Sequence, residues 1–506
     1  MIAPLGTHVR QRMAQLHRWT GLLLGWLLFV IFLTGTLSFF RQEITLWMQP
    51  ERPSFVENHP PAHWVEQALT FLEQQAQEAD HWLIQLPSAR DPLISLNWRG
   101  RLNQGQAWLD PTSGEEVLVR ATRGGDFFYR FHFQLHYLPV VFARYLVGIA
   151  SMLMLLALIS GIITHKKIVK DFFTFRPAKG QRSWLDAHNG FSVLALPFHL
   201  MITYTGLVTL MVLYIPWGME RAFPEPAERL ELLSEIFAFL PSESRSGEQA
   251  ALTDLSPLLE QAQQRWQGAE VGRVLLSHPG DRNAKVILLA QYDQPDRLGV
   301  TGHPPFLVFD AVSGVALREK ASNPIYSTYG VLLGLHLGRF ADWPTRWLYA
   351  LLGVAGCGML ASGLLLWSVK RRHKQGHSVF GLWLVDRLNL ATLVGFPIAL
   401  VAFFWLNRLL SASWPGRSEW EIHGLFLVWA AMCLHGCLRP LKAGWREQLG
   451  LAGGLLLGLP LINMVTTDKG LITSLLHSDW LFISVDLICL SLALLMFKLA
   501  FRQRTA

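Results

Sequence analysis

Eight apolar runs, each long enough to cross a lipid bilayer as a helix, constrain this chain more than any other feature. Only 16% of the 506 residues are charged and 51% are hydrophobic, whereas soluble proteins carry about 25% charged residues. Because backbone polar groups must be paired inside a bilayer, such runs predict an all-α transmembrane helical bundle. The runs cover residues 19–41, 140–164, 188–215, 346–369, 387–408, 420–438, 448–466 and 480–501.

Basic residues cluster beside these runs, so the net charge of +7 indicates membrane orientation and not nucleic-acid binding. The clusters lie at both termini and after the second, fourth and sixth runs, and they include Lys166, Lys167 and Lys170. The positive-inside rule then predicts cytoplasmic termini and two long external segments, 42–135 and 216–335. The first run lacks a cleavage signal before "RQEI", so we expect an uncleaved anchor.

The chain repeats itself. His17 lies eighteen residues before the glycine of "LTGTL", and His188 lies the same interval before the glycine of "YTGLV". The stretches "LDPTSGEEV" and "QLHYL" recur as "FDAVSGVAL" and "GLHLG", which pairs His136 with His336. A weaker third copy starts at "LVDRLNL", where Leu388 stands at the histidine position. We therefore expect two equivalent halves followed by an extension with no third histidine site of this kind.

Each external segment begins with a helical pattern and continues with short alternating strands that end in Asp-x-x-Ser-Gly turns. Each therefore predicts a small α+β module outside the bundle. The expected parts are 1–41 (N-terminus and first span), 42–135 (first external module), 136–215 (second and third spans with the basic loop), 216–335 (second external module), 336–372 (fourth span) and 373–506 (a four-span extension).

The eighteen histidines are the main chemical candidates, because ionisable groups at membrane depth are costly and usually functional. His188 and His199 are eleven residues apart, which on a straight helix gives nearly one face and an axial separation of about 16 Å. Neutral imidazole is an axial ligand of haem iron, and a bundle can hold a porphyrin beside small residues such as Gly21, Gly25 and Gly190. Two haem sites at different depths fit this spacing.

Two other interpretations of the histidines stay open. Zinc or copper would need three or four converging ligands, often with Asp, Glu or Cys, and a set of hydrogen-bonded boundary histidines needs no metal. His132, His423 and His435 are weaker candidate ligands of the iron, and His165 is equally consistent with an interfacial role. The four cysteines all lie in predicted spans, so no disulfide framework is expected. The sequence assigns no catalytic residue.

The sequence resembles the PepSY-associated transmembrane family of bacterial inner-membrane proteins linked to iron uptake. The resemblance covers about residues 10–372 and rests on "LHRWTGLLLGWLLFVIFLTGTLSFFRQEI", "FHFQLHYL", "THKKIVKDFFTFRPAKGQRSWLDAHNGFSVLALPFHLMITYTGL" and "LLGLHLGRF" with "ASGLLLW". It implies haem b, expected in two copies between the first four spans, and reduction of ferric siderophores. The implied ligand pool is His17, His136, His165, His188, His199 and His336. Depth places His17, His165 and His188 on the cytoplasmic side, and His136, His199 and His336 on the outer side.

If the protein is such a reductase, its substrate is a ferric siderophore or another ferric chelate, expected at the external face. No dinucleotide-binding or P-loop motif is visible, so the electron donor is expected to be a quinol, a small diffusing reductant or another protein. The external modules are then expected to bind the chelate or a periplasmic partner. Two other functions compete with this hypothesis: a membrane-anchored regulatory or binding scaffold without redox catalysis, and a permease for siderophore or haem.

Overall fold

The chain forms two compact units, the first from residues 1–50, 120–207 and 347–506 and the second from residues 51–119 and 208–346. The computed structural model describes residues 7–53, 59–101, 103–165, 168, 172–177, 179–237, 244–292, 294–319, 324–375 and 380–505. Lys166, Lys167 and Lys170 of the predicted basic loop lie outside the described residues.

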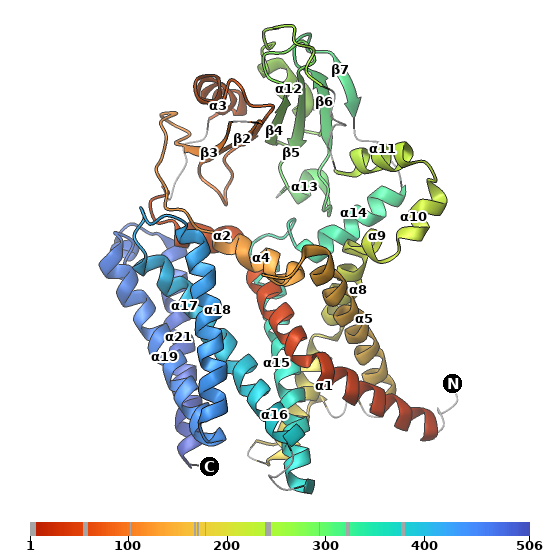
Figure 1. The fold of residues 1–506 in the computed structure, drawn as a ribbon, viewed down its shortest axis with the longest axis vertical. Coiled ribbons are helices and arrows are strands. Elements are labelled where there is room, and N and C mark those ends of the chain that lie inside the picture. Colours follow the sequence, from red (N-terminus) through yellow and green to blue (C-terminus); the bar gives the residue numbers. More distant parts are fainter. Residues whose placement is uncertain are drawn as a thin grey trace. The chain divides into compact units, whose positions relative to one another are not determined.

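The first unit is a bundle of long helices (Figure 1). Its core is apolar and includes Leu28 and Phe29 of the first helix, Met154 and Leu158 of the second long helix, and Phe403 of the extension. The helices are α1 (Thr7–Ser38), α2 (Arg41–Met48), α4 (Gly124–Gln134), α5 (Val140–Thr164), α7 (Gln181–Leu194), α8 (Leu196–Thr209), α15 (Trp343–Gln375), α16 (Phe380–Leu390), the π-helix η1 (Ala391–Gly395), α17 (Phe396–Leu409), α18 (Arg417–Leu438), α19 (Leu441–Thr466), α20 (Leu471–Leu476) and α21 (Trp480–Thr505).

Seven helices in the described part of the chain are long and apolar enough to cross a membrane, and the bent pair α7 and α8 brings the number to as many as eight. The seven are His8–Ser38, Val140–Thr164, Trp343–Arg372, Phe380–Leu409, Arg417–Leu438, Leu441–Thr466 and Trp480–Arg502. The prediction of a multi-pass all-α bundle is therefore confirmed.

The third predicted span is not a straight helix. Its halves α7 and α8 meet at an angle of 67°, with Ala195 between them. Pro197 explains the break, because proline donates no N–H and its ring clashes with the carbonyl four residues earlier. The straight-helix premise that placed His188 and His199 on one face is therefore wrong. Pro397 similarly follows the π-helical turn η1 inside the fifth span.

The repeats recur as matching side-chain contacts within the first unit. The carboxylate of Asp186, at the start of the third span, accepts from the guanidinium of Arg176 at 2.7 and 2.9 Å. The carboxylate of Asp386, at the equivalent position of the third copy, accepts from Arg372 at 2.8 and 2.9 Å. Asn389 also connects the third copy to the core, because its side-chain oxygen accepts from the indole N–H of Trp26 at 2.9 Å.

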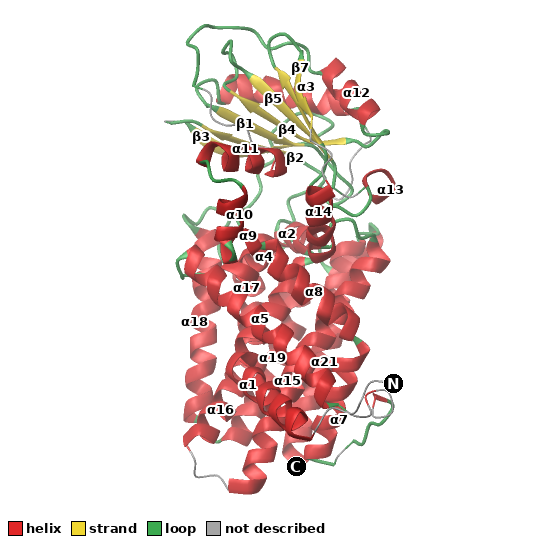
Figure 2. Ribbon diagram, turned by 90° about the vertical axis from the view of Figure 1, so that its right-hand side faces the viewer, coloured by secondary structure: helices red, strands yellow, loops and turns green. Residues whose placement is uncertain are grey.

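The second unit contains one seven-stranded antiparallel sheet of order β3-β2-β1-β4-β5-β6-β7 (Figure 2). Its strands are β1 (His81–Gln85), β2 (Ile94–Arg99), β3 (Gln104–Leu109), β4 (Val271–Ser277), β5 (Lys285–Ala290), β6 (Phe306–Asp310) and β7 (Ala316–Glu319). Its helices are α3 (Pro61–Gln75), α9 (Met211–Tyr214), α10 (Pro216–Ala222), α11 (Pro226–Phe237), α12 (Ser256–Arg265), α13 (Pro295–Leu298) and α14 (Pro324–Leu337).

The two predicted α+β modules share this sheet. β1 of the first module pairs with β4 of the second, with Trp82 opposite Leu276, so the hydrogen-bonded ladder continues from one module into the other. The first helix of each module, α3 and α12, packs with the strands in a common core that includes Leu72, Ile84 and Leu259. Joining the modules covers one long edge of each half-sheet, and exposed edges of that kind are prone to aggregation.

Candidate cofactor site

Three histidines of the first unit make the same contact with a neighbouring helix. In each case the ring nitrogen Nδ1 lies within hydrogen-bond distance of a backbone carbonyl. The contacts join His17 to Ala157 at 2.8 Å, His188 to Met359 at 2.8 Å and His132 to Ile31 at 2.7 Å. Because a carbonyl oxygen only accepts, Nδ1 must carry the proton and Nε2 must carry the lone pair. Metal-binding histidines are usually held in this way, with one nitrogen donating to the protein and the other bound to the metal.

A glycine four residues after each carbonyl makes room for the imidazole. In an α-helix the N–H of residue i+4 donates to the carbonyl of residue i, so a side chain at i+4 would crowd a second donor. A Cβ added at Gly35 would lie 2.7 Å from the His132 ring, one at Gly363 would lie 3.1 Å from the His188 ring, and one at Gly161 would lie 3.2 Å from the His17 ring. The glycine therefore lets the ring approach the carbonyl.

His17 and His188 face each other across the bundle. Their ring centroids are 6.0 Å apart, and the ring planes are inclined by 66°. With Nδ1 of both rings used by carbonyls, Nε2 is the nitrogen left for a ligand. Two imidazoles on opposite sides of one metal ion, each bonded at about 2 Å, have ring centres about 6 Å apart. The separation of this pair fits axial ligation of a single iron.

Two glycines close in sequence to these histidines border open space. A Cβ added at Gly21, one helical turn after His17, would meet no heavy atom within 4 Å, and the same holds for Gly190. Gly25 differs, because a Cβ there would lie 2.8 Å from Leu364. Two of the three small residues expected to admit a macrocycle therefore border open space.

His199 is fully buried, and neither of its ring nitrogens forms a hydrogen bond with a residue in the described part of the chain. The Leu352 backbone interacts with this ring without meeting hydrogen-bond geometry. A Cβ added at Gly356, four residues after Leu352, would lie 3.3 Å from Nε2 of His199. The four-residue spacing between carbonyl and glycine therefore recurs here. Burying two ring nitrogens that have no hydrogen bond is energetically costly.

Despite the bend between them, His188 and His199 lie against the same helix, α15, at Gly363 and Gly356. His199 also approaches α1, because its ring centroid lies 6.0 Å from that of Phe32. His132 contacts α1 one residue away, at Ile31. His132 and His199 therefore meet the same turn of α1, at a level different from that of His17.

The other predicted ligands lie in different environments. His165 caps the C-terminal end of α5, close enough to His188 for an electrostatic interaction. His136 lies in the exposed loop between α4 and α5, where its ring stacks on Phe426. His336 is half-buried near the end of α14, in the second unit.

The two weaker candidates of the extension already use ring nitrogens. Nδ1 of His423 pairs with the hydroxyl of Tyr137. Nε2 of His435 pairs with Glu447 at 2.9 Å, and Nδ1 of His435 lies 3.3 Å from the side-chain nitrogen of Gln448. His435 therefore has no ring nitrogen left for a metal. His132 was also among the weaker candidates, but its geometry fits a metal ligand better than that of His423 or His435. The glycine of "LTGTL", which makes room for the His132 ring, is the sequence feature that could have indicated this role.

The described residues contain no group of three or more His, Cys, Asp or Glu side chains arranged to hold a metal ion. Zinc and copper sites built from protein ligands alone usually need such a group. A haem supplies four ligands from its porphyrin and asks the protein for one or two imidazoles. Two histidines on different helices of this bundle fit the requirement of a haem for one or two imidazoles.

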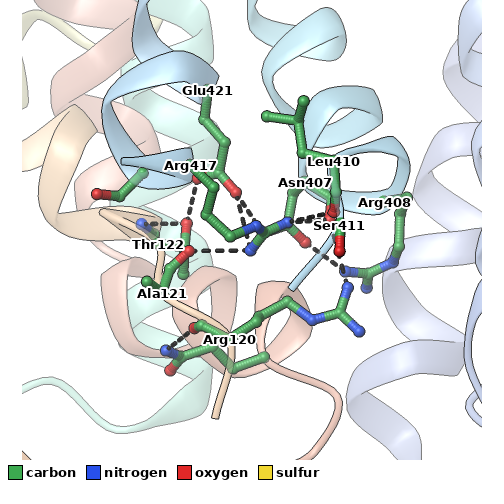
Figure 3. Close-up of polar contacts among 12 residues, drawn as sticks. Arg120, Ala121, Thr122, Asn407, Arg408, Leu410, Ser411, Arg417 and Glu421 are labelled. Carbon is green, nitrogen blue, oxygen red and sulfur yellow. Dashed lines mark hydrogen bonds and ion pairs between the residues drawn. The ribbon is translucent and has the colours of Figure 1, made fainter. Parts of the chain in front are cut away.

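A buried polar network joins the segment before α4 to the C-terminal extension (Figure 3). The side chains of Arg417 and Glu421 are both inaccessible to solvent and lie 3.3 Å apart. Arg417 also donates to the backbone carbonyls of Ala121 at 2.9 Å and Asn407 at 2.7 Å, and Glu421 accepts from Thr122. Because α4 follows this segment directly and carries His132, the network fixes the start of that helix against the extension.

Comparison with known proteins agrees with this architecture. Residues 14–370 match the model of the PepSY-associated TM region. The chain is also 27% identical over 334 residues to the uncharacterized protein PA4219 of Pseudomonas aeruginosa, a match that covers 61% of this chain and 79% of that protein. Since the family match covers more than half of the chain and spans both halves of the repeat, this membrane protein belongs to the PepSY-associated TM region family.

Proposed function

We propose that this protein is a b-type haem reductase of a bacterial inner membrane, which passes electrons across the bilayer to ferric iron held in a siderophore or similar chelate. The observation that carries the proposal is the His17 and His188 pair, with centroids 6.0 Å apart and both Nδ1 atoms held by carbonyls of other helices. Haem, when bound, supplies an iron centre that changes its charge by one electron, a reaction no side chain here offers.

The chain's own residues prepare both imidazoles for this role. The carbonyls of Ala157 and Met359 fix the proton on Nδ1, so Nε2 stays an unprotonated donor. The glycines at 161 and 363 hold each ring against its neighbouring helix, which limits rotation when the charge at the site changes. Imidazole rings and carbonyl groups that are held in place in this way need to move little when the charge at the site changes.

We assign a second haem to His132 and His199, which meet one turn of α1. The fixed tautomer of His132 and the unsatisfied ring of His199 support this pair over one that contains His136, whose ring is exposed and packs on the extension. His165 remains beside the first pair as a neighbouring polar group. With haem held at both pairs, the bundle would carry one-electron centres at two levels, from which a ferric chelate would be reduced.

The test is a count of haem per polypeptide on the purified protein, by the pyridine haemochrome method, with dithionite-reduced spectra of single variants. We expect two haems in the wild type and one in each of His17→Ala, His188→Ala, His132→Ala and His199→Ala. The matched control is His435→Ala, because both nitrogens of that ring are already used by side chains, and it should retain two haems. A wild-type sample with no b-type α-band would refute the proposal and favour the scaffold hypothesis.

Reduction of the chelate needs its own measurement. Proteoliposomes with a reductant on one side and a ferric hydroxamate on the other should form ferrous iron, trapped by ferrozine. Loss of His188 should abolish the signal, and His435→Ala should leave it unchanged. Uptake of intact ferric chelate without formation of ferrous iron would instead indicate a permease.

A further inference from the structure

An exposed cluster of aromatic and imidazole side chains lies where the α4–α5 loop meets α18. Its members are His136 and Tyr137 of the loop and Trp420, His423 and Phe426 of α18. The Tyr137 hydroxyl pairs with Nδ1 of His423, and the two rings are stacked at 5.8 Å with an angle of 12°. All five residues belong to the first unit.

The loop backbone is strained at this cluster. Leu135 and Tyr137 have φ angles of 44° and 69°, in the left-handed region that side chains other than glycine rarely adopt. Residues held in that region concentrate at functional sites, since packing alone rarely requires them. Here the strain places the rings of His136 and Tyr137 at a centroid distance of 4.3 Å, side by side over Phe426.

The cluster combines flat apolar surfaces with two proton acceptors. The ring of His136 lies parallel to that of Phe426, with an angle of 20°, and no hydrogen bond from a described residue reaches it. Burial lowers the pKa of His136, and the neighbouring His423 and Arg123 lower it further, while Glu419 opposes them. His136 therefore stays neutral near neutral pH and can accept a proton.

The apolar surface around the cluster indicates how its ligand arrives. Leu138, Val141 and Phe142 follow directly along the chain and are 40%, 55% and 58% exposed. Val141 and Phe142 begin α5, a helix long and apolar enough to span the bilayer, so in a membrane their exposed side chains would lie at the boundary of the apolar layer. We therefore expect a ligand with an apolar tail to approach this cluster along the membrane boundary.

We propose that this cluster binds the ring of a membrane quinol, which supplies the electrons of the reductase; the electron-transfer part rests on the function proposed above. An aromatic diol with an apolar tail matches the flat rings, the two polar acceptors and the approach along the membrane boundary. Phe426 of the cluster packs on Phe131, the residue before His132, with ring centroids 5.6 Å apart, so the site lies close to the second histidine pair.

The chemistry balances with groups already named. Oxidation of a quinol to a quinone breaks two O–H bonds and releases two protons and two electrons. One proton passes to the Tyr137 oxygen as the tyrosine proton moves to Nδ1 of His423, and the other goes to a ring nitrogen of His136. If haem is held at the two proposed pairs, each of its irons would accept one of the two electrons.

The site also gives the extension a role. Trp420, His423 and Phe426 all belong to α18, whereas His136 and Tyr137 belong to the repeated half that carries His132. The ion pair of Arg123 with Glu419 at 2.8 Å holds the two sides together beside the cluster. Neither side would form the site alone.

The experiment is photolabelling of the purified full-length protein with a decyl-chain azido-ubiquinone, followed by peptide mapping. We expect labels within residues 132–145 and 417–430, and at least tenfold weaker labelling in His136→Phe and His423→Phe. Tyr137→Phe keeps the ring and removes only the hydroxyl, so it should retain the fold and still lose most of the labelling. His477→Phe is the matched control, because His477 is exposed directly after α20 and its ring nitrogen Nδ1 lies 2.9 Å from the Thr473 carbonyl of that helix.

Labelling elsewhere in the chain, or labelling unchanged in all three variants, would overturn the proposal. The haem content of the same variants, measured from dithionite spectra, should equal that of the wild type. Reduction of haem by decylubiquinol should slow at least tenfold in the same three variants. Labels at the expected peptides in a protein without haem would uphold the quinone site and refute only the reductase.

Discussion

Substitution of Gly35 by alanine isolates the contact between a histidine and a neighbouring helix, because it changes neither the histidine nor any polar group. A Cβ at this position would lie 2.7 Å from Cε1 and 2.8 Å from Nδ1 of His132. Carbon atoms prefer separations of about 3.5 Å or more, so the ring would have to retreat by about 0.8 Å. Its bond to the Ile31 carbonyl, now 2.7 Å, would then exceed the length of a normal hydrogen bond.

Two effects of known size follow from this displacement. Loss of the hydrogen bond costs about 1 kcal/mol, and loss of such a contact behind a metal ligand weakens metal binding by about 10–100-fold. Glycine to alanine within a helix otherwise stabilises a protein by about 0.5–1 kcal/mol. Gly450→Ala in α19 of the extension, where the added methyl meets open space, should therefore keep or raise the melting temperature.

The assay is the haem content of detergent-solubilised protein after dialysis against apomyoglobin, which takes up haem released from weak sites. We expect Gly35→Ala to lose one haem of two at least tenfold faster than the wild type. Gly363→Ala, with its contact at 3.1 Å, should show a smaller effect on the other haem. Equal haem retention in Gly35→Ala and Gly450→Ala would refute the role given to the glycine.

Two further predictions concern stability. Glu421→Ala should destabilise the bundle by about 3–5 kcal/mol, because it removes the carboxylate that pairs with the buried Arg417 guanidinium. Glu419→Ala, at an exposed pair, should cost under about 1 kcal/mol in the same thermal unfolding assay. In the second unit, burial opposes ionisation of Asp281, but hydrogen bonds from three backbone N–H groups outweigh it and lower its pKa. Its contribution to stability is thus present above the ordinary carboxyl pKa of about 3.9 and lost as the pH falls below that value. The wild type should become more sensitive to pepsin as the pH falls from about 4 to 2, and Asp281→Asn should show a smaller change over the same range.

The bundle was predictable because a bilayer leaves a chain few options. A run of about 20 apolar residues must satisfy its backbone internally, so the number and approximate bounds of the spans follow from composition alone. The bend at Ala195 has a local cause in Pro197, but its angle of 67° depends on what packs against each half. The pairing of β1 with β4 was not predictable from the repeat, since equivalent modules could as easily form separate sheets.

Some of the histidine contacts could likewise be predicted from the sequence, and others could not. Their depth and their repeated positions marked His17 and His188, and the structure brings those two rings together. The choice between His132 and His136 could not be made from spacing, because four residues place both on one helical face. The chain leaves its helix after Gln134, with Leu135 in a left-handed conformation, and this turn directs His136 away to the extension.

The contacts also explain why the two proposed sites need not be equivalent. The first pair is symmetric, since His17 on α1 uses a carbonyl of α5 and His188 on α7 uses one of α15, the matching helices of the two repeats. The second pair has no such symmetry, because Leu28 stands at the position equivalent to His199 and Leu332 at that equivalent to His132. Identical surroundings would give two haems equal potentials and no preferred direction of electron flow. Under the proposed function, a symmetric first pair and an asymmetric second pair would give the two haems different potentials, a difference that redox titration of the α-band would resolve as two steps.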